Sequence, residues 1–168
     1  MQRRTLLKLG IGSAVVLAAA GAGVALLAPA WHDGRLADSG RAIFRAVAVA
    51  VLDGMLPTAT AERDTALLAH LGRLDGAIAV FPAATQAELA QLLGLLAVAP
   101  GRIGLAGLQP RWEDASVGAV QHALQSMRDS SLALRQQAYQ ALRDLTNAAY
   151  FSDPTTWQRI GYPGPVAL

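Results

Sequence analysis

Apolar residues recur at three- and four-residue steps in five stretches of this 168-residue chain. This spacing is the period of an α-helix, and it predicts helices over about 41–56, 63–80, 85–99, 116–127 and 131–150. The first stretch is apolar on nearly all sides, so we expect it at the centre of a bundle. No run alternates apolar and polar residues for long enough to predict a sheet. The pattern therefore predicts an all-α fold, a small bundle of about five helices.

Polar residues mark several of the predicted helix ends. Asp38 and Ser39 are candidate N-caps of the first helix. Thr85, followed three residues later by Glu88, has the spacing of a capping box at the start of the third. The second helix contains glycine at positions 72 and 76, where each costs about 1 kcal/mol relative to alanine. We expect these glycines to mark close contacts between helices.

The segments between the helices differ in character. Residues 31–40 are polar and turn-rich and predict a short linker before a helical domain over 41–151. Residues 100–115 form a long glycine-containing connection that carries Trp112. A connection of this length within a compact domain is uncommon and often functional. The alternative interpretation is a surface connection pinned by Trp112.

The last residues, 152–168, combine helix-breaking residues with large apolar ones. Three prolines and two glycines disfavour a regular helix and predict an extended tail. Yet Trp157, Ile160 and Tyr162 lie within it, directly after Phe151. Apolar side chains on an irregular tail have to pack either on the bundle or on another subunit.

The first thirty residues have the architecture of a secretory signal, with a basic start, an apolar middle and a small-residue end. The start resembles the twin-arginine (Tat) export signal, commonly written S-R-R-x-F-L-K, with Gln2 replacing the serine. The signal residues are Arg3, Arg4, Leu6, Leu7 and Lys8. We therefore predict Tat export to the periplasm.

Two fates of this segment stay open. The sequence Ala28-Pro29-Ala30 fits cleavage before Trp31. Alternatively, residues 9–30 remain as an N-terminal anchor, since 22 helical residues span about 30 Å of hydrocarbon.

The charge of the chain changes once this leader is set aside. After residue 30 the chain has 11 basic and 12 acidic residues, a net charge of −1. The high isoelectric point therefore belongs to the leader and does not indicate nucleic-acid binding. The remaining 138 residues are enough for one domain. The chain has no cysteine, which excludes disulfides, thiolate metal sites, iron–sulfur clusters and C-x-x-C-H haem attachment.

The remaining residue types predict no catalytic, metal or cofactor site. His32, His70 and His122 have no second histidine or carboxylate at the spacing of a helical metal site, so we interpret them as hydrated or locally satisfied. The adjacent pair Glu113-Asp114 lies where a helix N-terminus attracts negative charge. No G-x-S-x-G elbow or phosphate-binding glycine loop is present in the sequence. We therefore expect that the chain is not an enzyme.

The leader, the generic helical middle and the ending W-x-x-I-G-Y-P-G-P together resemble the gluconate 2-dehydrogenase subunit 3-like family. The matching positions are Arg3 and Arg4, Leu56-Pro57, Tyr150-Phe151, Trp157 and Gly161 to Gly164. The match spans most of the chain, although only the leader and the ending are specific.

The resemblance implies a non-catalytic small subunit of an exported dehydrogenase. Its partner would be a large subunit of the glucose-methanol-choline type that binds FAD, with a multihaem c-type cytochrome as a further subunit. The small subunit would assist export, folding and stability, either free in the periplasm or held at the inner membrane by its leader or by the complex. Besides the 100–115 connection, candidate partner-binding residues are Trp112, Tyr150, Phe151, Trp157, Ile160, Tyr162 and Pro163. The alternative is a free-standing periplasmic helical module that binds a small apolar ligand.

Overall fold

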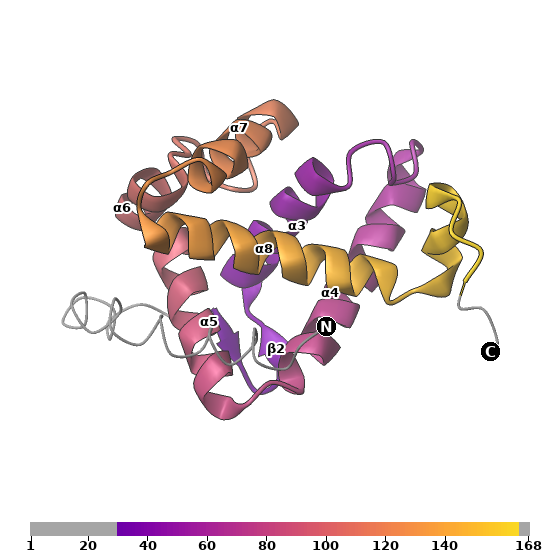
Figure 1. The fold of residues 1–168 in the computed structure, drawn as a ribbon, viewed down its shortest axis with the longest axis horizontal. Coiled ribbons are helices and arrows are strands. Elements are labelled where there is room, and N and C mark those ends of the chain that lie inside the picture. The colour runs from indigo at the N-terminus through magenta and orange to yellow at the C-terminus, as the bar shows by residue number, and fades with distance from the viewer. Residues whose placement is uncertain (1–29, 165–168) are drawn as a thin grey trace.

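The computed structural model describes residues 30–164, and the predicted export-signal residues lie outside this range. The described chain is all-α, as predicted, apart from one two-stranded hairpin (Figure 1). The helices are α3 (Asp38–Val51), α4 (Thr60–Ala79), α5 (Ala83–Ala97), α6 (Ala99–Gly101), the π-helical turn η1 (Arg102–Ala106), α7 (Val117–Arg128), α8 (Ala133–Phe151) and the 3₁₀-helix η2 (Pro154–Ile160).

Helix α3 forms the centre of the bundle, in agreement with its nearly uniform apolar character. It packs against α4, α5, α7 and α8, and α8 crosses it in Figure 1. Ile43, Phe44 and Val47 of α3 are completely buried. The other helices therefore share a main core built around α3. A smaller cluster near the end of α3 consists of Ala48, Leu52, Leu56, Leu67 and Tyr150.

Helix α5 and the segment after it fold back sharply. In residues 30–164 no single helix is both long and apolar enough to cross a bilayer. Helix α5 and the α6–η1 segment reach the required length and hydropathy only when taken together, and a bend of 91° separates them. At the bend, a Cβ atom on Gly101 would lie 1.9 Å from the carbonyl oxygen of Leu95. Only glycine allows this close approach of the two backbone segments.

Two of the predicted helix caps are wrong. The N-cap of α3 is Ala37, whose N–H binds the carbonyl of Ala30 at 3.0 Å, so Asp38 and Ser39 fall inside the helix. The N-cap of α5 is Pro82, and Thr85 lies within the first turn without a capping role. In both cases the preceding chain is already held in place, so the helix starts earlier than the polar residue. Helix α7, for which no cap was predicted from the sequence, is capped by Ser116, which accepts the N–H of Ala119 at 3.2 Å.

Residues 31–40, predicted to be a linker, instead contain a hairpin over 31–36 that packs into the core and, from Asp38, the start of α3. Strands β1 (Trp31–His32) and β2 (Arg35–Leu36) are antiparallel, and Trp31 and Leu36 are buried opposite each other. The turn at Asp33-Gly34 has positive φ at both residues, as a tight hairpin turn requires.

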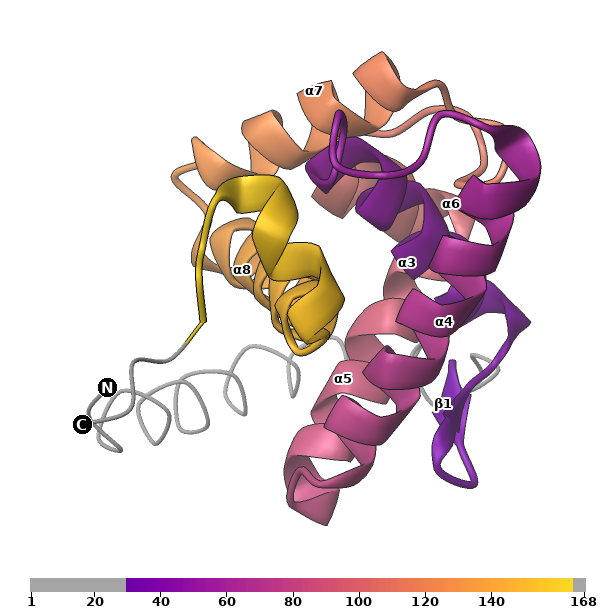
Figure 2. The ribbon, with the colours of Figure 1, turned by 90° about the vertical axis from the view of Figure 1, so that its right-hand side faces the viewer.

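The hairpin lies at the edge of the bundle beside α4 (Figure 2). Asp75 of α4 accepts the N–H of Leu36 at 2.9 Å and pairs with Arg41 at 2.6 Å. The Trp31 Nε1–H donates to Gln86 of α5 at 3.0 Å. Side-chain hydrogen bonds thus fasten the hairpin to two helices.

His70 does not fit the expectation of a hydrated or satisfied histidine. It is completely buried on α4, which packs on α8, and neither ring nitrogen has a hydrogen-bond partner among the residues described. Thr146 of α8 is likewise fully buried with an unpaired hydroxyl. Burial, and next the positive charge of Arg73, lower the pKa of His70 from 6.5 to about 4.

The buried His70 predicts a loss of stability in acid. The unfolded chain binds a proton at His70 near pH 6.5 and the folded chain only near pH 4. The contribution of neutral His70 to the free energy of unfolding is therefore complete above pH 6.5. About 3 kcal/mol of that free energy is lost as the pH falls to 4. Urea unfolding across this range measures the effect. In His70→Leu the loss of unfolding free energy between pH 6.5 and 4 should be smaller by about 3 kcal/mol. The control His122→Gln, which changes an exposed histidine, should show the same loss as the native chain. Equal pH profiles for the two variants would contradict this prediction.

The bend at Gly101 predicts a position-specific glycine requirement. Gly101→Ala should lower the free energy of unfolding by about 2 kcal/mol, because the added methyl group collides with backbone. Gly104→Ala is the matched control, since no described atom beyond its chain neighbours and its own helix backbone lies within 4 Å of its Cβ position. That change should stay within about 0.5 kcal/mol. Chemical denaturation compares the two, and equal stabilities would refute the assigned role of Gly101.

Candidate docking surface at the C-terminal tail

The tail is folded rather than extended. The side chain of Asp153 caps η2 by accepting the N–H of Thr155 at 3.0 Å, and Pro154 occupies the first helical position. Gly161 ends the helix in the left-handed conformation, with φ of 69°. Aspartate at the N-cap, proline after it and glycine at the end are the residues these positions favour. The prolines and glycines therefore delimit a short 3₁₀-helix instead of preventing one.

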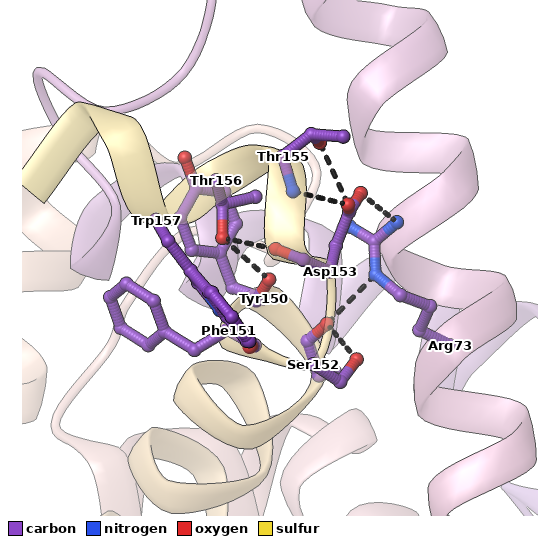
Figure 3. A network of polar contacts seen from close by, with 9 residues as sticks. Arg73, Tyr150, Phe151, Ser152, Asp153, Thr155, Thr156 and Trp157 are labelled. Carbon is purple, nitrogen blue, oxygen red and sulfur yellow. Dashed lines mark hydrogen bonds and ion pairs between the residues drawn. The ribbon is translucent and has the colours of Figure 1, made fainter. Parts of the chain in front are cut away.

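Arg73 of α4 fastens this tail to the bundle (Figure 3). Its Nε donates to the carbonyl of Ala149 at 2.8 Å, and its Nη1 lies 3.2 Å from Asp153 Oδ2. The hydrogen bonds from Thr155, and then the charge of Arg73, hold the pKa of Asp153 below its ordinary value. The start of η2 is thereby tied to both α8 and α4.

The residues of the W-x-x-I-G-Y-P-G-P ending fold the tail onto itself. The Trp157 Nε1–H donates to the carbonyl of Phe151 at 2.7 Å. The ring of Tyr162 packs edge-on against Trp157, with centroids 5.4 Å apart, and Gly164 lies against the same indole. Thr156 donates its hydroxyl to the backbone carbonyl of Asp153 at 2.7 Å. This packing fixes the direction in which the last apolar side chains point.

Two of the predicted partner-binding residues are buried in the bundle. Trp112 is 3% exposed and donates Nε1–H to the carbonyl of Leu96 at 2.8 Å. Tyr150 is 5% exposed, and its hydroxyl donates to the carbonyl of Met55 at 3.0 Å. Neither side chain presents a surface to a partner in this structure. The aromatic residue type was visible in the sequence, but the neighbours that cover it were not.

The other predicted residues form a surface at the end of the chain, which we call the tail surface. Ile160 is 50% exposed and Tyr162 45% exposed, and Pro163 is exposed beside them. Phe151 and Trp157 are half-buried beneath. The tail surface is apolar, and hydrogen bonds of its own backbone hold it in place.

The 100–115 connection winds around Arg102 and is anchored by its few buried residues. Arg102 is 8% exposed, and its guanidinium donates to the carbonyls of Leu108 and Gln109, both at 3.3 Å. Together with the burial of Trp112, this agrees with a pinned connection rather than an open functional loop.

A cavity of about 220 Å³ lies between this connection and the start of α3. Arg102 and the ion pair of Arg111 with Glu113 are in its wall. Pockets for small molecules usually measure about 300–1,000 Å³. The cavity is therefore small for the ligand that a binding module would require.

The described part of the chain contains no group of three His, Cys, Asp or Glu side chains that could hold a metal ion. Comparison of the chain with protein-family models, with curated proteins and with solved structures gives no match. The family resemblance of the leader and the ending thus stays a prediction.

The packing of Trp157 predicts that it holds the tail in place. Trp157→Ala should free the residues that follow it from the bundle. A loss of about 1–2 kcal/mol in the local stability of the tail implies that trypsin should cut after Arg159 roughly 5–30 times faster. The control Gln158→Ala alters an exposed neighbour. The cleavage rate is read by mass spectrometry, and equal rates in the two variants would show that the indole does not hold the tail.

Proposed function

We propose that this chain is a non-catalytic accessory subunit that escorts a cofactor-bearing dehydrogenase through Tat export and stabilises it in the periplasm. The partner is a large subunit of the glucose-methanol-choline type, and the FAD belongs to that partner. A c-type cytochrome is a further member of the complex. The complex, or an uncleaved leader, holds the chain at the inner membrane.

The observation that carries this proposal is the tail surface. Ile160 and Tyr162 are large apolar side chains held in solvent by a segment that is itself well tied to the bundle. A rigid apolar projection of this kind is characteristic of protein–protein contact sites. It also loses little conformational freedom when a partner covers it.

The leader supports the export half of the proposal. The pair Arg3-Arg4 and the residues that follow resemble a signal for folded cargo. A large subunit without a signal of its own would leave the cell only while bound to this chain. Binding must therefore precede export, which requires a contact surface formed by the folded domain.

Export of the partner tests the escort role. The chain is expressed together with a flavoprotein dehydrogenase of its host that has no export signal of its own, and flavin absorbance is measured in the periplasmic fraction. Replacing the pair by Arg3→Lys and Arg4→Lys should reduce the exported flavoprotein at least about ten-fold, because the partner depends on this leader. Unchanged export of the flavoprotein would refute the proposal.

Binding of the partner tests the tail surface. Ile160→Asp combined with Tyr162→Asp should weaken the complex at least about ten-fold, since both changes place a charge in an apolar contact. Leu132→Asp is the matched control, because Leu132 is 61% exposed just before the start of α8. Calorimetric titration gives both dissociation constants. Equal weakening by the two variants would contradict docking through the tail.

A further inference from the structure

The peptide bond between Ala30 and Trp31, where the sequence fits removal of the leader, lies inside the folded domain. Ala30 has no exposed surface, and Trp31 is 7% exposed. Both side chains belong to the main core around α3. Peptidases normally cut a folded protein at exposed, weakly held segments, since the chain has to enter their active site. The residues on both sides of this bond are therefore in an unusual position for a cleavage site.

The carbonyl oxygen of Ala30 is already engaged within the chain. It accepts the N–H of Ala37 at 3.0 Å. It also lies against the first turn of α3, where a Cβ atom added at Gly40 would be only 2.6 Å from it. A peptidase has to reach the carbonyl carbon with its nucleophile and surround this oxygen with its own hydrogen-bond donors. The contact with α3 blocks that approach as long as it holds.

Trp31, on the other side of the bond, is held by two helices. Its indole N–H donates to Gln86 of α5 at 3.0 Å, and the hairpin pairs it with Leu36. The N–H of Leu36 donates to Asp75 of α4 at 2.9 Å, and the side chain of Asp75 is 14% exposed. To adopt an extended conformation in a peptidase, the hairpin would have to leave both helices. That opening is costly, because it exposes the buried indole to water.

The order of folding and export decides whether this burial protects the bond. The leader resembles a signal for folded cargo, so the hairpin is in place before the leader reaches the outer side of the membrane. A peptidase there depends on the small fraction of molecules in which the hairpin is transiently open. This step rests on the export half of the proposed function.

We propose that the folded hairpin withholds the Ala30–Trp31 bond from leader peptidase, so that residues 1–30 stay on the exported chain and anchor it in the membrane. The apolar run of the leader ends at Leu27, three residues before Ala30. The anchor is therefore joined to the bundle with almost no spacer, which holds the domain close to the bilayer surface. A partner bound to the domain stays at the membrane as well.

Cleavage of the full chain by purified leader peptidase tests this protection. The native chain and its variants are synthesised without membranes and kept in detergent, and mass spectrometry follows the new N-terminus at Trp31. Asp75→Ala removes the acceptor of the Leu36 N–H and should raise the cleavage rate at least about ten-fold, because the hairpin opens more often. Asp64→Ala is the matched control and should be cut at the native rate. It removes the ion pair of another α4 aspartate with an arginine of α3 and leaves both ties of the hairpin in place.

Gln86→Ala is an independent variant, because it releases the Trp31 indole and leaves Asp75 unchanged. It should be cut about three to ten times faster than the native chain. Circular dichroism checks that the helices remain, and either hairpin variant alone decides the result. A native chain that is cut as fast as the hairpin variants overturns the proposal, and so does an acceleration that Asp64→Ala shares.

The mass of the exported chain in its host is the second measurement. In spheroplasts, the exported chain is the fraction that added trypsin digests. That fraction should have the mass of the full chain with its leader, whereas a mass that corresponds to a start at Trp31 overturns the proposal. The escort role is read from the exported flavoprotein and the protection from the N-terminus of this chain, so the two can fail separately.

Discussion

The structure depends on the burial of α3 by the helices around it. Ile43, Phe44 and Val47 have no exposed surface, and burying a side chain of this size contributes roughly 1.5–3 kcal/mol. The chain has no cysteine, so disulfides do not contribute to its stability. Apolar packing around one central helix therefore has to hold together the helices, the hairpin and the bend at Gly101. The same packing encloses His70, whose imidazole has no hydrogen-bond partner among the described residues.

Helix α4 connects this core to both ends of the described chain. Asp75 receives the N-terminal hairpin, and Arg73 receives the C-terminal tail. Each tie is formed by a charged residue at a border of α4, where it is partly shielded from water. The consequence is that one helix fastens both ends of the described chain to the core.

The proposed contact surface at the tail suits a partner that has a recess. Ile160 and Tyr162 project from the tail surface and can enter such a recess on another protein. Hydrogen bonds hold the segment that carries them, so little ordering is needed when a partner binds.

The sequence alone determined the helical class and the course of the main helices, because the apolar period reflects which side of each helix meets the core. It did not show the close backbone approach at Gly101 or the capping of α7 by Ser116. Only the tertiary structure decided which polar and aromatic residues are covered. His70, Trp112 and Tyr150 are buried, and residues 31–36 pair as a hairpin, through contacts with helices distant in sequence. The physical reason is that residue type and spacing record local geometry, whereas burial depends on which element packs opposite.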